Sequence, residues 1–153
     1  MSTPKANTTK GHCLCRTIEY EFEGQPKWVM HCHCESCRRA VSSAVATYVG
    51  VNIDQFQYLK GTPAVYESSP GVKRYFCPTC GSPMAYAGAR WPKEVHLFIG
   101  TLDNPGKFAP TGHAHITEQV DWFDVHDDLP RYDTLAAGGA KPVAKGPRKA
   151  AKA

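Results

Sequence analysis

The segment Gly11–Gly24, GHCLCRTIEYEFEG, decides the fold class. Its second half alternates apolar Ile18, Tyr20 and Phe22 with polar residues, which is the period of a half-buried β-strand, and Gly24 marks the turn that ends it. Its first half holds two cysteines separated by one residue. Similar cysteine clusters recur at 31–37 (HCHCESC) and 76–81 (FCPTCG). The sequence therefore predicts short strands organised around cysteine clusters.

Short apolar runs of the same kind continue along the chain, and only the segment after Cys37 suggests a helix, of a single turn. We expect further strands at 28–30, 44–49, 56–59, 64–67, 72–76, 84–86 and 95–99. The predicted fold class is mainly β with little helix. We divide the chain into a flexible N-terminal arm (1–9), one zinc-binding domain (10–133) and a basic tail (134–153) whose Ala, Gly, Pro and Lys composition predicts disorder.

The charge of the chain is uneven. The formal net charge is +4, but five of the 18 Lys and Arg residues lie in the last twenty positions, and the 14 acidic residues all precede them. The body is therefore mildly acidic, and it has no basic stripe interleaved with aromatics, so we expect no nucleic-acid partner. No apolar run is long enough to cross a membrane, and the first residues lack the apolar core of a signal peptide. These features predict a cytoplasmic protein without membrane association.

The seven cysteines point to metal rather than to disulfides. A reducing compartment disfavours disulfides, an odd number cannot pair completely, and the Cys13/Cys15 and Cys32/Cys34 spacings would close small, strained rings. Thiolates that converge on an ion suit these spacings better, and zinc is the ion that such thiolate clusters most often bind.

Keeping each cluster together divides the cysteines between two zinc ions per chain. A closed structural site would consist of Cys13, Cys15, Cys77 and Cys80, with Gly81 permitting the turn. An open, catalytic site would consist of Cys32, Cys34 and Cys37. Two alternatives remain: one of the middle three cysteines could complete the FCPTCG knuckle instead, or His31 or His33 could close the second site and make both ions structural.

The ordered motifs resemble those of a known family, the glutathione-dependent formaldehyde-activating enzymes and their relative centromere protein V. The motifs are GHCLCRTIEYEF, CHCESCRRA, FCPTCGSPMAY and PTGHAHITEQVDWFDVHDDLPRY, within residues 10–133. The resemblance implies a β-tent, a folded-over antiparallel sheet with zinc knuckles, and the same division of the cysteines. The chain departs from the family pattern at Arg16, where glycine is common, and in the extra residues of TGHAH. The family histidine is then His113 or His115, and the neighbouring Ile116 favours His115.

The open site predicts carbon–sulfur chemistry. Zinc bound by three thiolates has a net charge of −1 and favours a soft fourth ligand, for which a substrate thiol such as glutathione is the natural candidate. The resemblance implies a carbon–sulfur lyase similar to S-hydroxymethylglutathione synthase, which joins glutathione to formaldehyde. Arg38 could pair with a substrate carboxylate, and His115 is the second catalytic candidate. Arg39, Glu35 and His33 are weaker candidates.

Two other functions stay open at this stage. A non-catalytic zinc-binding interaction module is the main alternative, supported by the basic tail alone, and zinc storage or redox sensing by the three-cysteine cluster is the other. Three tryptophans are expected in the core rather than at a ligand surface, namely Trp28, Trp91 and Trp122.

Overall fold

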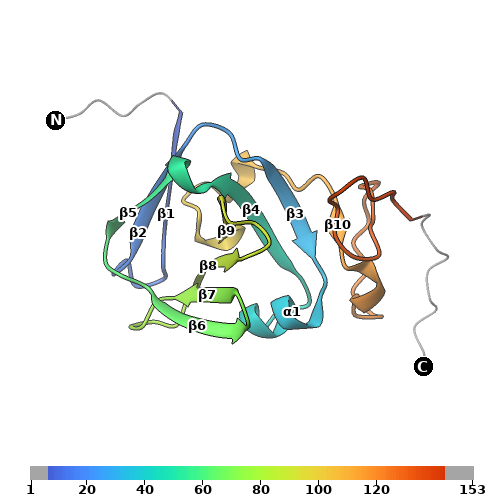
Figure 1. The fold of residues 1–153 in the computed structure, drawn as a ribbon, viewed down its shortest axis with the longest axis horizontal. Coiled ribbons are helices and arrows are strands. Elements are labelled where there is room, and N and C mark those ends of the chain that lie inside the picture. Colours follow the sequence, from blue (N-terminus) through green and yellow to red (C-terminus); the bar gives the residue numbers. More distant parts are fainter. Residues whose placement is uncertain (1–6, 144–153) are drawn as a thin grey trace. The chain divides into compact units, whose positions relative to one another are not determined.

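The structure of the protein is a computed structural model that describes residues 7–143; most of the predicted N-terminal arm and half of the predicted tail (1–6 and 144–153) lie outside this range. The described residues form strands, one α-helix and short 3-10 helices (Figure 1). The strands are β1 (Thr8–His12), β2 (Glu19–Glu23), β3 (Trp28–Cys32), β4 (Ala46–Asn52), β5 (Phe56–Lys60), β6 (Ala64–Ser69), β7 (Val72–Phe76), β8 (Pro83–Gly88), β9 (Glu94–Phe98) and β10 (His113–Ala114). The helices are α1 (Glu35–Val41), η1 (Ile53–Gln55), η2 (Ile99–Thr101), η3 (Pro105–Lys107) and η4 (Ile116–Glu118).

The chain divides into two compact units that are interleaved along the sequence. The first contains the residues up to Val29 and Tyr48–Ala109, and the second contains Met30–Thr47 and the residues from Pro110 onward. Strands β3 and β4 each begin in one unit and end in the other. The four cysteines of the predicted structural site all belong to the first unit, and the three of the predicted open site all belong to the second.

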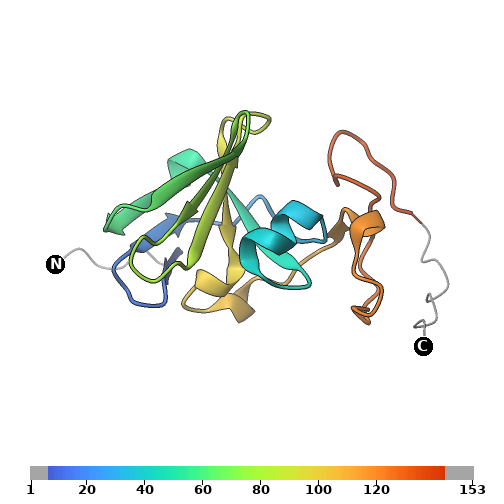
Figure 2. The ribbon, with the colours of Figure 1, turned by 90° about the horizontal axis from the view of Figure 1, so that it is seen from below.

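The first unit is built from two antiparallel arrays with the core between them (Figures 1 and 2). One array has the order β1-β2-β5, and the other includes β4, β9, β8, β7 and β6 as neighbours in that order. The alternation of β2 places Tyr20 and Phe22 in the core, both fully buried, while the three glutamates that alternate with them are more exposed. From the second array, Val49, Met84 and Leu97 complete the same core cluster. The alternating pattern therefore predicted the buried face correctly.

The second unit contains α1 and a short parallel strand pair. Cys34 caps the N-terminus of α1, and the helix ends at Ser42, whose φ of 51° is left-handed. Strand β10 pairs in parallel with the end of β3, so that His113 lies opposite His31 and Ala114 opposite Cys32. This pairing connects residues that are about 80 positions apart in the sequence.

The mainly β prediction is confirmed, while the β-tent assignment stays a prediction. Strand β1 begins at Thr8, within the predicted arm, and its sequence TTKGH has no apolar alternation that would have announced it. Helix α1 is longer than the single turn expected and begins before Cys37. No helix within residues 7–143 is long and apolar enough to cross a membrane.

Candidate functional site

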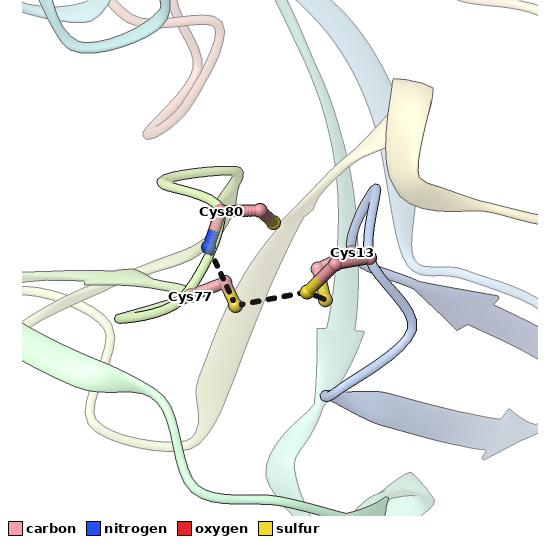
Figure 3. A group of neighbouring side chains, drawn as sticks. Cys13, Cys77 and Cys80 are labelled. Atoms are coloured by element: carbon pink, nitrogen blue, oxygen red, sulfur yellow. Dashed lines mark hydrogen bonds between the residues drawn. The ribbon is translucent and has the colours of Figure 1, made fainter.

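The four-cysteine cluster joins the loop after β1 to the turn between β7 and β8. Its four sulfurs all lie within 4.8 Å of one another. The Sγ of Cys15 lies 3.6 Å from that of Cys13 and 3.8 Å from that of Cys77. Figure 3 shows Cys77 and Cys80 approaching Cys13 from the β7–β8 turn. A tetrahedron with Zn–S bonds of about 2.3 Å has edges of about 3.8 Å, so these sulfurs fit one zinc ion.

Backbone amides point to sulfurs of this cluster and lower their pKa values, although burial outweighs the amide at Cys13 and raises the pKa of that thiol. The N–H of Ile18 points to the Sγ of Cys13 at 3.3 Å, and the N–H of Cys80 points to that of Cys77 at 3.5 Å. The Ser82 hydroxyl, 3.2 Å from the Cys80 Sγ, together with the backbone N–H groups of Ser82 and Cys15, lowers the pKa of Cys80 to about 5. Gly81 has a φ of 77° that a side chain rarely allows, and its N–H donates to the Cys77 carbonyl.

The predicted open site is assembled from the end of β3 and the first turn of α1. The sulfurs of Cys32, Cys34 and Cys37 lie within 4.8 Å of one another, and the Cys37 N–H donates to the Cys34 Sγ at 3.3 Å. The neighbouring thiols of Cys34 and Cys37, together with burial, raise the pKa of Cys32. A metal ion bound by these sulfurs would supply the positive charge that favours their thiolate form.

Among residues 7–143, the group around Cys32 includes three sulfurs and no imidazole nitrogen. That arrangement gives no support to a second site closed by His31 or His33. The seven sulfurs form separate groups of four and three. This grouping does not support the alternative in which Cys32, Cys34 or Cys37 completes the site of the FCPTCG knuckle. That the two clusters bind zinc, and that one is structural and the other catalytic, stays a prediction.

The two arginines after the open cluster have different surroundings. Arg38 is half-buried, and its Nε donates to the carbonyl oxygen of His33 at 3.0 Å. Arg39 is exposed and pairs with Glu35 one turn earlier at 2.9 Å. Arg39 and Glu35 thus form a solvated surface pair, whereas Arg38 holds the backbone of the cysteine loop.

A network of buried histidines adjoins the open cluster in the sequence. The Nε2 of His33 lies 2.8 Å from the Nδ1 of His113, and the Nε2 of His113 lies 2.9 Å from the Oδ2 of Asp127. Burial, reinforced by His113, lowers the pKa of His33 to about 4, so its ring is neutral. Burial raises the pKa of Asp127, but the His113 hydrogen bond and the Leu129 N–H outweigh it and hold that pKa below its usual value. Asp127 is therefore an ionised acceptor.

His115, which the sequence favoured as the family histidine, lies outside this network. It precedes η4 with a left-handed φ of 56° and faces the exposed Glu118, with 3.4 Å between its Nδ1 and the carboxylate. His113 is only 1% exposed and occupies the network instead. The sequence offered no signal for Asp127. The role assigned to His115 stays a prediction, and no contact of the residue favours it.

The prediction for the tryptophans is corrected in one case. Trp122 is 74% exposed and does not belong to the core. Trp28 and Trp91 are half-buried and pack beside His96, with ring centroids 4.5 and 5.3 Å from its own. Arg16, where the family pattern commonly has glycine, has a left-handed φ of 60°, which explains that preference.

These features define a mainly β protein with two cysteine clusters that could hold metal ions. The chain belongs to the family described as glutathione-dependent formaldehyde-activating enzyme, whose model matches residues 8–118. The resemblance drawn from the sequence motifs is thereby confirmed.

Two individual proteins are similar to the chain. An uncharacterised lyase of Schizosaccharomyces pombe is 28% identical over 94 residues, which cover 59% of this chain and 66% of the relative, just under two thirds of its length. A crystal structure of a Rhodobacter sphaeroides protein matches with a TM-score of 0.54 and 24% identity, covering 61% of this chain and 87% of the other. At that identity the second likeness concerns the fold alone.

Proposed function

We propose that the protein is a zinc-dependent carbon–sulfur lyase that acts on the adduct of a thiol such as glutathione and a small aldehyde, in the manner of S-hydroxymethylglutathione synthase. Family membership supports the reaction class. The observation that carries the proposal is the group of three sulfurs, which has no fourth protein ligand among residues 7–143. A tetrahedral ion held by three side chains keeps one position for a substrate.

Cys32, Cys34 and Cys37 would hold this ion, which when bound would lower the pKa of a substrate thiol and keep it nucleophilic. The second ion would be held by Cys13, Cys15, Cys77 and Cys80 and would stabilise the first unit. In the direction of synthesis, a C–S bond forms between the thiol sulfur and the aldehyde carbon, and the aldehyde oxygen becomes a hydroxyl. The proton that the thiol loses is the proton that the oxygen gains, so the reaction needs no further reactant.

Arg38 is our candidate for substrate binding. Its Nε is engaged by the His33 carbonyl, while its two Nη atoms make no hydrogen bond or ion pair within residues 7–143. A guanidinium held at one nitrogen can still present the other two to a carboxylate, in bidentate geometry. Glutathione has two carboxylates, so Arg38 would distinguish it from simpler thiols.

The non-catalytic interaction module has no such support. Its only sequence feature was the basic tail, half of which lies outside the described residues. No feature within residues 7–143 favours it over the lyase.

The test is the exchange between glutathione, formaldehyde and their adduct, followed by NMR line broadening with the metal-loaded protein. The native protein should accelerate exchange, and Cys34→Ser should abolish it. Arg38→Gln should raise the KM for glutathione about 10-fold or more, because a charge-assisted hydrogen bond contributes about 1.5–3 kcal/mol. Because Arg38 also holds the His33 carbonyl, Arg38→Gln should change the reaction of 2-mercaptoethanol, which has no carboxylate, far less than that of glutathione.

The matched control is Arg39→Gln, one residue further along the same helix, for which no change in KM is expected. A native protein that carries both ions but does not accelerate exchange would refute the proposed function. Equal effects of Arg38→Gln and Arg39→Gln would refute only the role of Arg38.

A further inference from the structure

The rings of His31, His33 and His113 form a cluster at the end of β3. Successive side chains of a strand point to opposite faces, so His31 and Cys32 diverge. The β10 pairing places His113 opposite His31, and their rings stack with centroids 4.8 Å apart. The His33 ring lies edge to edge with that of His113, with centroids 5.1 Å apart and a hydrogen bond between the two rings. Three imidazoles thus gather apart from the three sulfurs.

Two of these rings converge with a carboxylate. The potential ligand atoms of His31, His113 and Asp127 all lie within 4.8 Å of one another. The group is partly sheltered, because His113 is 1% exposed and the Asp127 side chain 24%. Two imidazole nitrogens and one carboxylate oxygen form a donor set that borderline divalent ions prefer, with positions left open.

Each of the three side chains also makes a hydrogen bond to a residue outside the group, through a polar atom that the ion would not need. The Nδ1 of His31 lies 2.8 Å from the Oγ1 of Thr47, which leaves the Nε2 of His31 for a ligand role. The Nδ1 of His113 is held by His33 at 2.8 Å, which leaves its Nε2 facing Asp127. Such outer contacts fix ring orientation in metal sites.

The carboxylate is fixed in the same way. The Oδ1 of Asp127 accepts from the Leu129 N–H at 3.0 Å and from the Nη1 of Arg131 at 3.3 Å. Its Oδ2 is the atom closest to His113. The Nε2 of His113 therefore faces the Asp127 carboxylate, and a ring nitrogen of His31 lies within 4.8 Å of both.

We propose that His31, His113 and Asp127 form a third metal site, which takes a divalent ion of the Zn²⁺ or Fe²⁺ class. Two neutral imidazoles, one carboxylate and a divalent ion have a net charge of +1, opposite in sign to the −1 of a zinc ion on three thiolates. The open positions of this third ion would therefore accept an anionic or neutral oxygen ligand rather than a thiol. The site is independent of the lyase reaction proposed above.

A bound ion would also change the tautomers of the histidine network. Without metal, ionised Asp127 only accepts, so the Nε2 of His113 carries hydrogen; in the neutral form of that ring, its Nδ1 accepts from the Nε2–H of His33. The Nδ1 of His33 is then a bare nitrogen, buried and without a hydrogen-bond partner. An ion on the Nε2 of His113 moves its hydrogen to Nδ1. His33 must then accept at Nε2 and carry hydrogen at Nδ1.

The experiment measures metal binding by the full chain whose cysteine clusters are already loaded with zinc. Added Co²⁺ should bind as one further equivalent without a sulfur-to-cobalt charge-transfer band, because the ligands are nitrogen and oxygen. His31→Gln and Asp127→Asn should each weaken this third equivalent by more than about 100-fold, beyond the range of an outer-contact mutation. The matched controls, His126→Gln and Asp124→Asn, alter a more exposed His–Asp pair and should leave all three equivalents.

A second pair of variants keeps the test decisive if Asp127→Asn does not fold. Thr47→Ala should lower the affinity for the third ion about 10- to 100-fold, because it removes the hydroxyl beside His31. Thr47→Ser, which keeps a hydroxyl, should bind that ion as the native chain does. In ¹⁵N NMR of the histidine rings, Zn²⁺ should exchange the hydrogen-bearing nitrogens of His113 and His33. The proposal is overturned if the native chain takes up no third equivalent. It is overturned equally if His31→Gln binds that equivalent as tightly as His126→Gln does.

Discussion

Replacement of Cys80 by serine tests whether the two cysteine clusters differ in their contribution to folding. The four-cysteine cluster connects segments far apart in the first unit, since Cys15 and Cys77 are separated by 62 positions. The three-cysteine cluster connects residues from Cys32 to Cys37 only. A cross-link stabilises a fold by restricting the unfolded chain, and the restriction grows with the length of chain that it closes.

The difference can be worked out from these separations. The chain-entropy relation gives about 4 kcal/mol for a loop of 62 residues and about 2 kcal/mol for a loop of five. Loss of the ion in Cys80→Ser should therefore lower the free energy of unfolding by about 2 kcal/mol more than loss of the ion in Cys34→Ser. Against a typical total of about 5–15 kcal/mol, a loss of about 4 kcal/mol is large enough to make a domain at the lower end of that range marginally stable.

The assay is urea unfolding of both variants, with zinc content measured on the same samples. At a urea dependence of about 2 kcal/mol per molar, the midpoint of Cys80→Ser should fall about 2 M and that of Cys34→Ser about 1 M. Equal destabilisation of Cys34→Ser and Cys80→Ser, with one ion lost from each variant, would refute this difference between the clusters.

Two further predictions concern the core of the first unit. Gly50→Ala would bring a Cβ to 2.2 Å from the Trp28 ring and should lower the free energy of unfolding by about 1–3 kcal/mol in thermal unfolding. Gly100→Ala, at a position with open space, should leave that free energy unchanged. Equal stability of the two variants would contradict the packing described. Burial raises the pKa of Tyr58 from 10.0 to about 12, so the folded state keeps a proton that the unfolded state loses, and stability should fall as pH rises from 10 to 12. Tyr58→Phe should reduce that fall in alkaline urea titrations, whereas Tyr66→Phe, at an exposed position, should leave it unchanged.

The strands with regular alternation could be predicted because their pattern is local. Tyr20 and Phe22 alternate with glutamates, and this alternation alone determines which face of β2 packs into the core. Strand β1 could not be predicted, because its buried positions are Thr9 and Gly11, which carry no apolar signal. The start of α1 was missed for a similar reason, since its cap is a cysteine and its only buried residue is Cys37.

The same division between local and distant information applies to the candidate sites. The grouping of cysteines into four and three was readable because the cysteines lie in three short motifs, and the members of each motif stay in one group. The histidine network was not readable, because it depends on a two-residue parallel pairing between β10 and β3. The sequence could not show that His113 faces inward and His115 outward, since the left-handed backbone at His115 follows from the local turn.

The short length of β10 has a consequence for local unfolding. Its attachment to β3 consists of two residue pairs, supported by backbone hydrogen bonds of His31 to Gly112 and of His33 to Ala114. So small a ladder opens more readily than a buried core strand, and amide hydrogens there should exchange with solvent sooner than those of β2 or β9. Such an opening would separate His113 from His31 while Cys32, Cys34 and Cys37 stay together on one continuous stretch of chain. Release of an ion from the histidines would then be a fast, reversible event that leaves the sulfur cluster intact.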